Sequence, residues 1–411
     1  MAGDETQYMV QEMHPPAGTA PPKKKPRKSR RRLKVAVFCW ESLYAERVGG
    51  LAPVATALAE KIAGDHEVHF FTRGPSGDQD IHGVHYHYCV PSGPNIVAYC
   101  RDMSAKLFER FRDYDSPPFD LIHFHDWHFV DTLRELKNRN TVISFHSTEY
   151  GRNGGNFGDW WEFGEISGME WFAAHIAHQI ITVSRTTRDE IVKLYHVPET
   201  RIRVIPNGID PDRYRLPVDA GTVKREYGID PAAPLILFVG RLVYQKGPDL
   251  LLDAVPLILR NHPDAQFIIA GDGSMRVHCE EKARGLPVRF TGYISDGEHL
   301  KLLNSADIVI IPSRNEPFGL VLTEAWSANR CVVASDVGGL AENIENFVDG
   351  IRVSVTPESF AWAVNYLLDD PTSIKAFGAA GRRKVEKNFT WDKVITMMLE
   401  VYAAVAAVET T

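Results

Sequence analysis

The chain has 411 residues, of which 44% are hydrophobic and 24% charged, and its net charge at pH 7 is −7. It is long enough for two ordinary domains, and the negative charge argues against a dedicated nucleic-acid binder. No apolar run reaches the roughly eighteen residues that span a bilayer, and five scattered cysteines without CxxC spacing or a secretory leader fit a reducing compartment. We therefore expect a soluble cytoplasmic protein.

The first 32 residues contain the basic run PPKKKPRKSRRR, Pro21 to Arg32, and no apolar periodicity. We expect this segment, residues 1–32, to be disordered. Such a run can bind nucleic acid, an anionic surface or an import receptor, but it is more often a solvated tail. We favour the solvated tail and do not expect it to contact nucleic acid.

The first predicted strand is LKVAVFCW, Leu33 to Trp40, a continuous apolar run typical of a strand buried on both faces of a parallel sheet. A Gly49-Gly50 turn and an amphipathic helix follow it. Further strands are predicted at HEVHFFT, FDLIHFHDW, TVISFH and QIITVS. This alternation predicts a doubly wound α/β domain over residues 33–208, with functional loops at the carboxyl ends of its strands.

The second half repeats the scheme, beginning at APLILFVGR, residues 233–241. Its further strands are predicted at QFIIAGDG, VRFTGY, ADIVIIPS and RCVVASD. A second Rossmann-like domain is thus expected over residues 209–388, with the segment 210–221 as linker and a cleft between the domains. The last segment, residues 389–411, has apolar residues at helical spacing.

Two cations stand at one strand-to-helix corner of the second half. Arg241 comes just past a strand, and Lys246 directly precedes Gly247, Pro248 and a helix. Fixed charge beside a helix N-terminus suits a diphosphate, and we favour this over two solvated surface cations. The chain has no GxxxxGK[ST] and no GxGxxG, which argues against a P-loop kinase and a standard dinucleotide dehydrogenase.

The stretch SRNEPFGLVLTEAW, Ser313 to Trp326, carries two carboxylates around a Pro-Phe-Gly elbow. Glu316 belongs to the loop and Glu324 to the following helix, so they do not form a dyad. Glu316 is expected in the cleft beside the amides of the Gly319 turn, and Glu324 at another part of the same ligand, such as vicinal ribose hydroxyls. On spacing alone, both glutamates could equally favour only the positive end of the helix.

The combination of motifs resembles the retaining glycosyltransferases of family 4, on the GT-B fold, and among them the glycogen and starch synthases. The resemblance runs from about Val35 to Tyr402. Its motifs are RVGGLAPV (47–54), HFHDWH (123–128), FHSTEYGR (145–152), ITVSRTTRDEI (181–191), VIPNGID (204–210), FVGRLVYQKG (238–247), IAGDG (269–273), the pair Glu316 and Glu324, and SDVGGLAENI (335–344). The family implies two Rossmann-like domains facing a cleft, with a last helix that crosses back to the first domain.

The resemblance also implies site residues. Those for the nucleotide-sugar donor are Gly49, Gly50, Arg241, Lys246, Tyr293, Glu316, Phe318, Gly319, Leu320 and Glu324. Those for catalysis are His146, Glu316, Arg241, Lys246 and Asp126. In this scheme Arg241 and Lys246 neutralise the diphosphate, Glu316 binds the transferred sugar and Glu324 holds the ribose. His146 lies beside the reacting sugar and Asp126 near the acceptor; a buried, satisfied histidine is the lesser alternative for His146.

No residue is obviously committed as a general base or as a nucleophile, so the front-face route proposed for the family fits best. No DxD motif stands at a strand end with the other marks of a Mg²⁺-dependent transferase, and the two cations replace the charge of a metal, so we expect no metal or other cofactor. Tyr293 weakly favours ADP-glucose over UDP-glucose as the donor. The elbow EPFGL occurs in enzymes with other acceptors, which leaves open an α-glucan, a small glucoside or another sugar; a GT-B sugar-nucleotide epimerase and an inactive nucleotide-sugar binder are the remaining alternatives.

Overall fold

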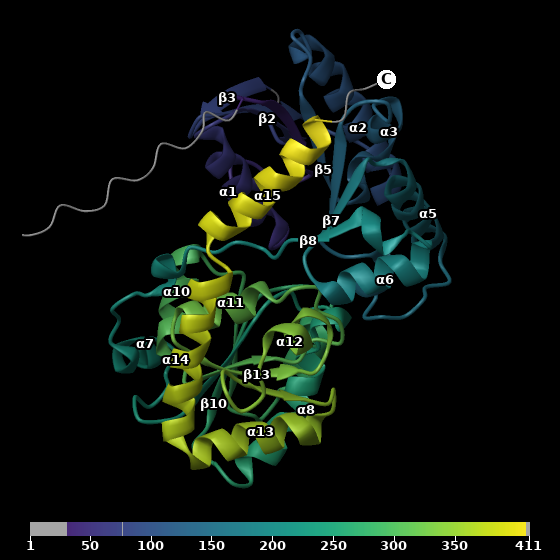
Figure 1. Ribbon diagram of the computed structural model, residues 1–411. Helices are drawn as coiled ribbons and strands as arrows, with labels where there is room; N and C mark the ends of the chain where they lie inside the picture. Colours follow the sequence, from purple (N-terminus) through teal and green to yellow (C-terminus); the bar gives the residue numbers. More distant parts are fainter. Residues whose placement is uncertain (1–30, 76, 408–411) are drawn as a thin grey trace, which may run out of the picture. The chain divides into compact units, whose positions relative to one another are not determined.

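The computed structural model describes residues 31–75 and 77–407 (Figure 1). The predicted disordered tail lies outside the described residues except for its last two positions, Arg31 and Arg32. From Leu33 onward the described chain forms one compact unit. It contains two sheets with helices packed on them, so the predicted α/β class with two Rossmann-like domains is confirmed.

The first sheet has the strand order β3-β4-β2-β1-β5-β6-β7-β8. Its strands are β1 (Lys34–Phe38), β2 (Glu67–Arg73), β3 (Gly77–Ile81), β4 (Val84–Cys89), β5 (Leu121–His125), β6 (Thr141–Phe145), β7 (Gln179–Thr182) and β8 (Ile202–Val204). All neighbours are parallel except β3 and β4. Its helices are α1 (Leu51–Ala63), α2 (Ile96–Tyr114), α3 (Val130–Glu135), α4 (Glu149–Arg152), α5 (Trp161–Ile176) and α6 (Arg185–Tyr195).

The second sheet is parallel throughout, in the order β11-β10-β9-β12-β13-β14. Its strands are β9 (Leu235–Val239), β10 (Gln266–Ala270), β11 (Val288–Gly292), β12 (Ile308–Ile311), β13 (Cys331–Ser335) and β14 (Ile351–Val353). Its helices are α7 (Ala220–Glu226), α8 (Pro248–Leu259), α9 (Arg276–Lys282), α10 (Asp296–Ser305), α11 (Leu320–Ser327), α12 (Gly338–Asn343), α13 (Pro357–Asp369) and α14 (Pro371–Asn388). Counted from β9 as the first strand, this is the order 3-2-1-4-5-6 of the dinucleotide-binding doubly wound fold.

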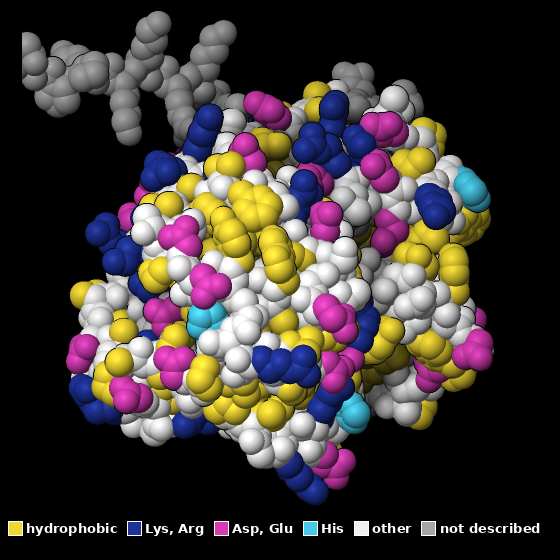
Figure 2. Space-filling view, turned by 90° about the horizontal axis from the view of Figure 1, so that it is seen from below, with side chains coloured by type: hydrophobic (Ala, Val, Ile, Leu, Met, Phe, Trp, Pro, Cys, Tyr) yellow, Lys and Arg dark blue, Asp and Glu magenta, His cyan; other side chains and the backbone are white. Residues whose placement is uncertain are grey.

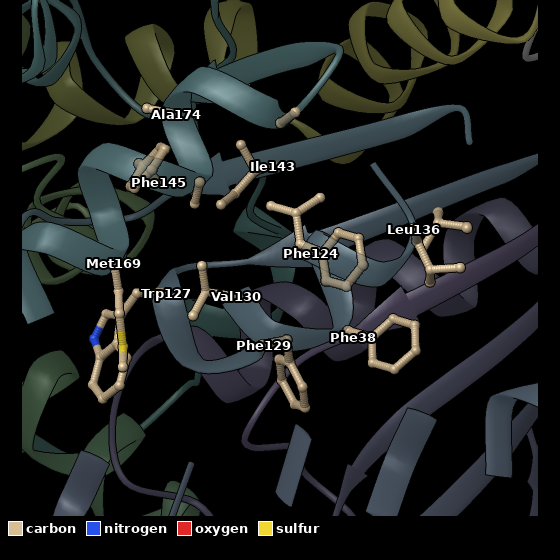
Figure 3. Close-up of a cluster of buried hydrophobic side chains, with 14 of the residues drawn as sticks. Phe38, Phe124, Trp127, Phe129, Val130, Leu136, Ile143, Phe145, Met169 and Ala174 are labelled. Carbon is tan, nitrogen blue, oxygen red and sulfur yellow. The ribbon is translucent and has the colours of Figure 1, made fainter. Parts of the chain in front are cut away.

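The apolar runs that predicted the strands form the cores of both sheets. In the first domain the ring of Phe38 stacks against Phe71 and Phe124, at centroid distances of 4.8 and 5.0 Å. Figure 3 shows Phe38 and Phe124 together with Phe129, which follows β5. Each of these side chains is almost fully buried, and burying one such ring contributes about 1.5–3 kcal/mol. The core therefore fixes where the carboxyl ends of β1 and β5 lie.

The strand order reverses beside β1 in the first sheet and beside β9 in the second. In open α/β sheets, ligands bind outside the carboxyl ends of the strands at such a point. Glu41 follows β1 and Asp126 follows β5, while Arg241 follows β9 and Glu316 follows β12. The fold thus delivers four polar side chains to the two positions where a doubly wound domain binds its ligand.

Figure 2 shows one face of the molecule, on which Lys and Arg side chains are interspersed with Asp and Glu. Within residues 31–75 and 77–407, no helix combines the length and the apolar character needed to cross a membrane.

The last helix, α15 (Trp391–Ala406), returns to the first domain, where it packs against α1 and β5 (Figure 1). Its buried residues are Trp391, Val394, Met398, Leu399, Val401, Tyr402 and Val405. The hydroxyl of Tyr402 lies 2.7 Å from Nδ1 of the buried His123 of β5. The crossing helix that the resemblance implied therefore contributes apolar area and one buried polar contact to the first domain.

We predict that Tyr402→Phe lowers the free energy of unfolding by about 1–3 kcal/mol, because it removes the partner of a buried imidazole nitrogen. Tyr366→Phe is the matched control, since Tyr366 lies on α13 and is 39% exposed. Urea denaturation of both variants measures the difference. Equal losses in the two variants would contradict a specific role for the Tyr402 hydroxyl.

Candidate functional site

The corner after β9 is built by a close approach of two chain segments. Gly247 has φ +65°, and a Cβ on it would lie 2.1 Å from the carbonyl oxygen of Pro312, so only glycine fits there. This approach holds the preceding residue, Lys246, against the loop that follows β12. Nζ of Lys246 consequently lies 2.7 Å from Oε2 of Glu316, and the two side chains are 23% and 10% exposed.

Glu316 is held through both its side chain and its backbone. Its Oε2 also accepts a hydrogen bond from the Ser313 hydroxyl at 3.1 Å. Its carbonyl oxygen accepts one from the Gly339 amide at 2.7 Å, at the start of α12. The SDVGGLAENI motif thus contacts the elbow through its backbone. These hydrogen bonds fix the position of Glu316 before any ligand binds.

Arg241 is the second cation of this corner and its side chain is exposed. It donates to Oε1 of Gln245 at 3.4 Å. Desolvation lowers the pKa of Arg241, while the carboxylates of Glu316 and Glu41 oppose that shift. An arginine remains charged in any case, so the corner presents one cation paired with Glu316 and one exposed cation.

The Gly49-Gly50 turn lies against the same corner, and a buried carboxylate binds backbone amides of this loop. A Cβ on Gly50 would lie 2.5 Å from Cδ1 of Leu320, the first residue of α11. The buried carboxylate of Glu41 accepts hydrogen bonds from the amides of Val48 at 2.5 Å and Gly49 at 3.0 Å. The predicted neighbours Gly50 and Leu320 are therefore together, and the Gly49 amide already has a partner. Sequence analysis missed Glu41, although its place just after a buried strand was a usable signal.

Glu324 lies in the middle of α11, about one turn beyond the elbow. The hydroxyl of Tyr214, from the predicted linker, donates to its Oε1 at 3.1 Å. Arg47 comes from the loop before Gly49 and forms an ion pair with Asp296 at 2.7 Å. Desolvation lowers the pKa of Arg47, but Asp296, Tyr293 and Glu324 together raise it above its ordinary value. Tyr293 is 73% exposed, so a cation, a carboxylate and an open aromatic ring stand near one another here.

Asp126 supports the segment that carries His146. It has a positive φ of 56°, and its buried Oδ1 accepts a hydrogen bond from the amide of His146 at 2.7 Å. Desolvation raises the pKa of Asp126 to about 6, although Arg152 and the amides of His146 and Ser147 lower it. Burial also lowers the pKa of His146 to about 4, against the opposing charge of Glu41. The imidazole of His146 is therefore neutral near pH 7.

The rest of the FHSTEYGR motif is anchored on buried carboxylates. Arg152 forms ion pairs with Glu149 at 2.8 Å and with the fully buried Glu170. Glu170 also accepts the amide of Glu149 at 2.8 Å and the hydroxyl of Tyr195. Arg152 therefore has structural partners in the first domain.

The FHSTEYGR motif also meets the elbow. The carboxylate of Glu190 accepts a hydrogen bond from the Thr148 hydroxyl. Desolvation raises the pKa of Glu190, while the hydrogen bonds of Thr148 and of Asn315 lower it. Asn315 is the residue before Glu316, so the segment holding His146 and the elbow holding Glu316 share one network.

The predicted residues do not line the cavities found in the first domain. A cavity of about 860 Å³ lies between β4 and α2, lined by Tyr88, Cys89, Val90, Lys106, Glu109, Arg110, Arg112 and Asp113. Among residues 31–75 and 77–407, no group of three or more His, Cys, Asp and Glu side chains has the arrangement of a metal site. The candidate site is accordingly defined by the converging side chains described above.

Comparisons with known proteins show which family and fold this chain resembles. Residues 48–213 match the family model described as Glycosyltransferase Family 4, and residues 219–384 match Glycosyl transferases group 1. An uncharacterized glycosyltransferase of Methanocaldococcus jannaschii is 36% identical over 90% of this chain and 98% of its own. Glycogen synthase of Mycobacterium tuberculosis is 32% identical over 90% and 95%. The solved sucrose-phosphate synthase of Thermosynechococcus elongatus has the same fold, with a TM-score of 0.76 at 23% identity over 92% of this chain and all of its own.

The raised pKa of Asp126 predicts how the free energy of unfolding depends on pH. Between about pH 4 and pH 6 the folded protein retains a proton on Asp126 that the unfolded chain has lost, so this contribution to stability falls as pH rises through that window. The free energy of unfolding of the parent protein relative to Asp126→Asn should therefore decrease by up to about 3 kcal/mol from pH 4 to pH 7.

Asp78→Asn, on β3, is the control for this titration. Desolvation raises the pKa of Asp78, but hydrogen bonds from Tyr114, His87 and Arg110 lower it to about 2. Its contribution changes only below about pH 4, because it is ionised in both states above that. Denaturation curves of Asp126→Asn and Asp78→Asn, recorded with the parent protein at several pH values, measure both differences in the free energy of unfolding. A pH-independent difference for Asp126→Asn would rule out the retained proton.

Proposed function

The chain belongs to the family 4 glycosyltransferases, and from this membership we propose that it is a retaining hexosyltransferase. It moves glucose from ADP-glucose or UDP-glucose to an α-glucan or a small glucoside, as a glycogen synthase does. The observation that supports this most is the convergence of Lys246, Glu316, Arg241 and the Gly49-Gly50 turn at the carboxyl ends of β9 and β12. A nucleoside diphosphate sugar needs cations for its diphosphate and hydrogen-bond acceptors for the hydroxyls of its sugar. This corner holds both.

In this proposal the donor lies along α11. Arg241 and Lys246 contact the diphosphate, and the amides of Gly319 and Leu320 at the start of α11 add to the site. Glu324 accepts hydrogen bonds from the ribose hydroxyls, and the exposed ring of Tyr293 lies beside the base. Arg47, near both Glu324 and Tyr293, is a donor-side residue that sequence analysis did not select.

The transferred glucose then lies between the elbow and the segment after β6. Glu316 accepts hydrogen bonds from its hydroxyls, with Phe318 next to it in the elbow, and His146 faces the sugar from the first domain. Asp126 is too deeply buried to receive the acceptor directly. We assign it a positioning role, because its carboxylate holds the His146 amide.

The reaction follows from what these groups supply. The bond between the anomeric carbon and the phosphate oxygen breaks, and its electron pair goes to the leaving diphosphate. Arg241 and Lys246 stabilise the charge that develops there, which lowers the barrier more than it strengthens ground-state binding. The acceptor hydroxyl forms the new bond on the same face and gives its proton to the leaving phosphate. The product keeps the α configuration, and the two cations supply the positive charge without a metal.

The direct experiment measures release of nucleoside diphosphate from ADP-glucose and UDP-glucose, each with glycogen, maltose or glucose 1-phosphate. We expect release that depends on one of these acceptors. Conversion of the donor without any acceptor would indicate an epimerase, and binding without turnover under every combination would indicate an inactive binder. Either result would overturn the proposal.

Loss of either cation should slow the chemical step. Arg241→Ala and Lys246→Ala are each expected to lower kcat about a hundredfold, by analogy with removal of one preorganised transition-state donor. Donor binding should weaken less, because the amides of α11 also serve the ground-state diphosphate. Lys246→Ala also leaves Glu316 without its cation, so it should destabilise the fold more than Arg241→Ala does.

Lys282→Ala is the matched control, because Lys282 also pairs with a carboxylate at 2.7 Å in the second domain, but on α9. It should retain parent activity. Initial rates over a range of donor concentrations separate kcat from KM for all three variants. Parent turnover in both Arg241→Ala and Lys246→Ala would place the diphosphate elsewhere.

A further inference from the structure

His125, the last residue of β5, faces His146 through ring nitrogens. Nδ1 of His125 lies 2.9 Å from Nε2 of His146, and the rings are 21° from parallel. Desolvation lowers the pKa of both rings, so both are neutral near pH 7. Two neutral imidazoles at this distance must share one hydrogen bond, in which one nitrogen carries the proton and the other offers its lone pair.

The environment of His125 decides which nitrogen carries the proton. Its other nitrogen, Nε2, is buried and has no hydrogen-bond partner within the described part of the chain. A buried N–H without a partner is rarer and costlier than an acceptor without one. The proton of His125 therefore belongs on Nδ1, where it is donated to His146.

The neighbouring histidine does not compete for this proton. The ring of His123 lies against that of His125 at a centroid distance of 4.4 Å, tilted by 32°, but both of its nitrogens already have hydrogen-bond partners. Its Nδ1 contacts the Tyr402 hydroxyl and its Nε2 contacts the Ser144 hydroxyl, each at 2.7 Å. His123 thus fixes the position of the His125 ring without offering it a hydrogen bond.

We propose that His125 is a positioning residue that locks His146 as the Nδ1–H tautomer. Nε2 of His146 then accepts from His125, and its Nδ1 is a permanent N–H donor. The consequence for catalysis rests on the proposed function: His146 donates a hydrogen bond to a sugar hydroxyl or a phosphate oxygen and does not remove the acceptor proton. This leaves the leaving phosphate as the proton acceptor in the same-face reaction.

The tautomer is measured directly in the full chain, with ring-15N-labelled histidine and long-range 1H–15N NMR at neutral pH. The signals of His146 are assigned by their loss in His146→Gln. We expect a protonated, pyrrole-type Nδ1 and a pyridine-type Nε2. This measurement needs no substrate, so it tests the inference even if the proposed activity fails. The opposite tautomer in the parent protein would overturn the inference.

Two variants of His125 test whether this residue sets the tautomer of His146. His125→Asn keeps an amide N–H near the place of Nδ1–H and should preserve the tautomer, whereas His125→Phe removes the donor and should release His146 to its Nε2–H form. With an active pair of substrates, His125→Phe should lower kcat about tenfold to hundredfold, by analogy with loss of a group that orients a metal-bound histidine, and His125→Asn should restore most of that loss. KM should change little.

His87→Phe is the matched control, because His87 is a buried histidine of the same sheet that pairs with Asp78 instead. It should alter neither the His146 signals nor kcat. An unchanged His146 tautomer in folded His125→Phe would show that another group sets it and would overturn the inference.

Discussion

The candidate site depends most on the contact between Lys246 and Glu316. An ion pair at this depth loses hydration on both sides, and it is favourable only where hydrogen bonds complete it. The Ser313 hydroxyl supplies such a bond to the Glu316 carboxylate, and the Gly339 amide holds the backbone carbonyl of Glu316. The close approach of Gly247 to Pro312 supplies the geometry for Lys246. Because both segments follow strands at the reversal point of the sheet, the fold presents a fixed cation and a fixed acceptor before a ligand arrives, which is the condition for electrostatic catalysis.

In the first domain, a buried carboxylate that follows a strand holds the backbone amides of a loop at the site. Glu41 binds the amides of Val48 and Gly49, and Asp126 binds the amide of His146. Such charge-assisted bonds are shorter and stronger than neutral ones. They make the loops rigid, so the residues facing the ligand keep their positions. The raised pKa of Asp126 shows that this arrangement has a cost in desolvation.

Much of the fold was predictable because parallel strands buried on both faces leave continuous apolar runs, as in β1, β9 and β12. The edge strand β3 was missed because its sequence, GDQDI, is polar and mostly exposed. The corner with Arg241 and Lys246 was also predictable, since its residues are neighbours in the chain. The roles of Asp126 and His125 were not, because they depend on which distant backbone amide or ring each side chain meets. For Asp126 and His125 that partner lies about twenty residues away, beyond the reach of local spacing.

The proposed function requires that glucose is transferred with its α configuration kept, because the acceptor hydroxyl attacks on the face that the leaving phosphate departs from and gives its proton to that phosphate. The most direct measurement is proton NMR of the first product formed from an α-linked nucleoside diphosphate glucose, recorded before the products equilibrate. The account predicts the coupling of an α-anomeric proton. A β-anomeric product would contradict it.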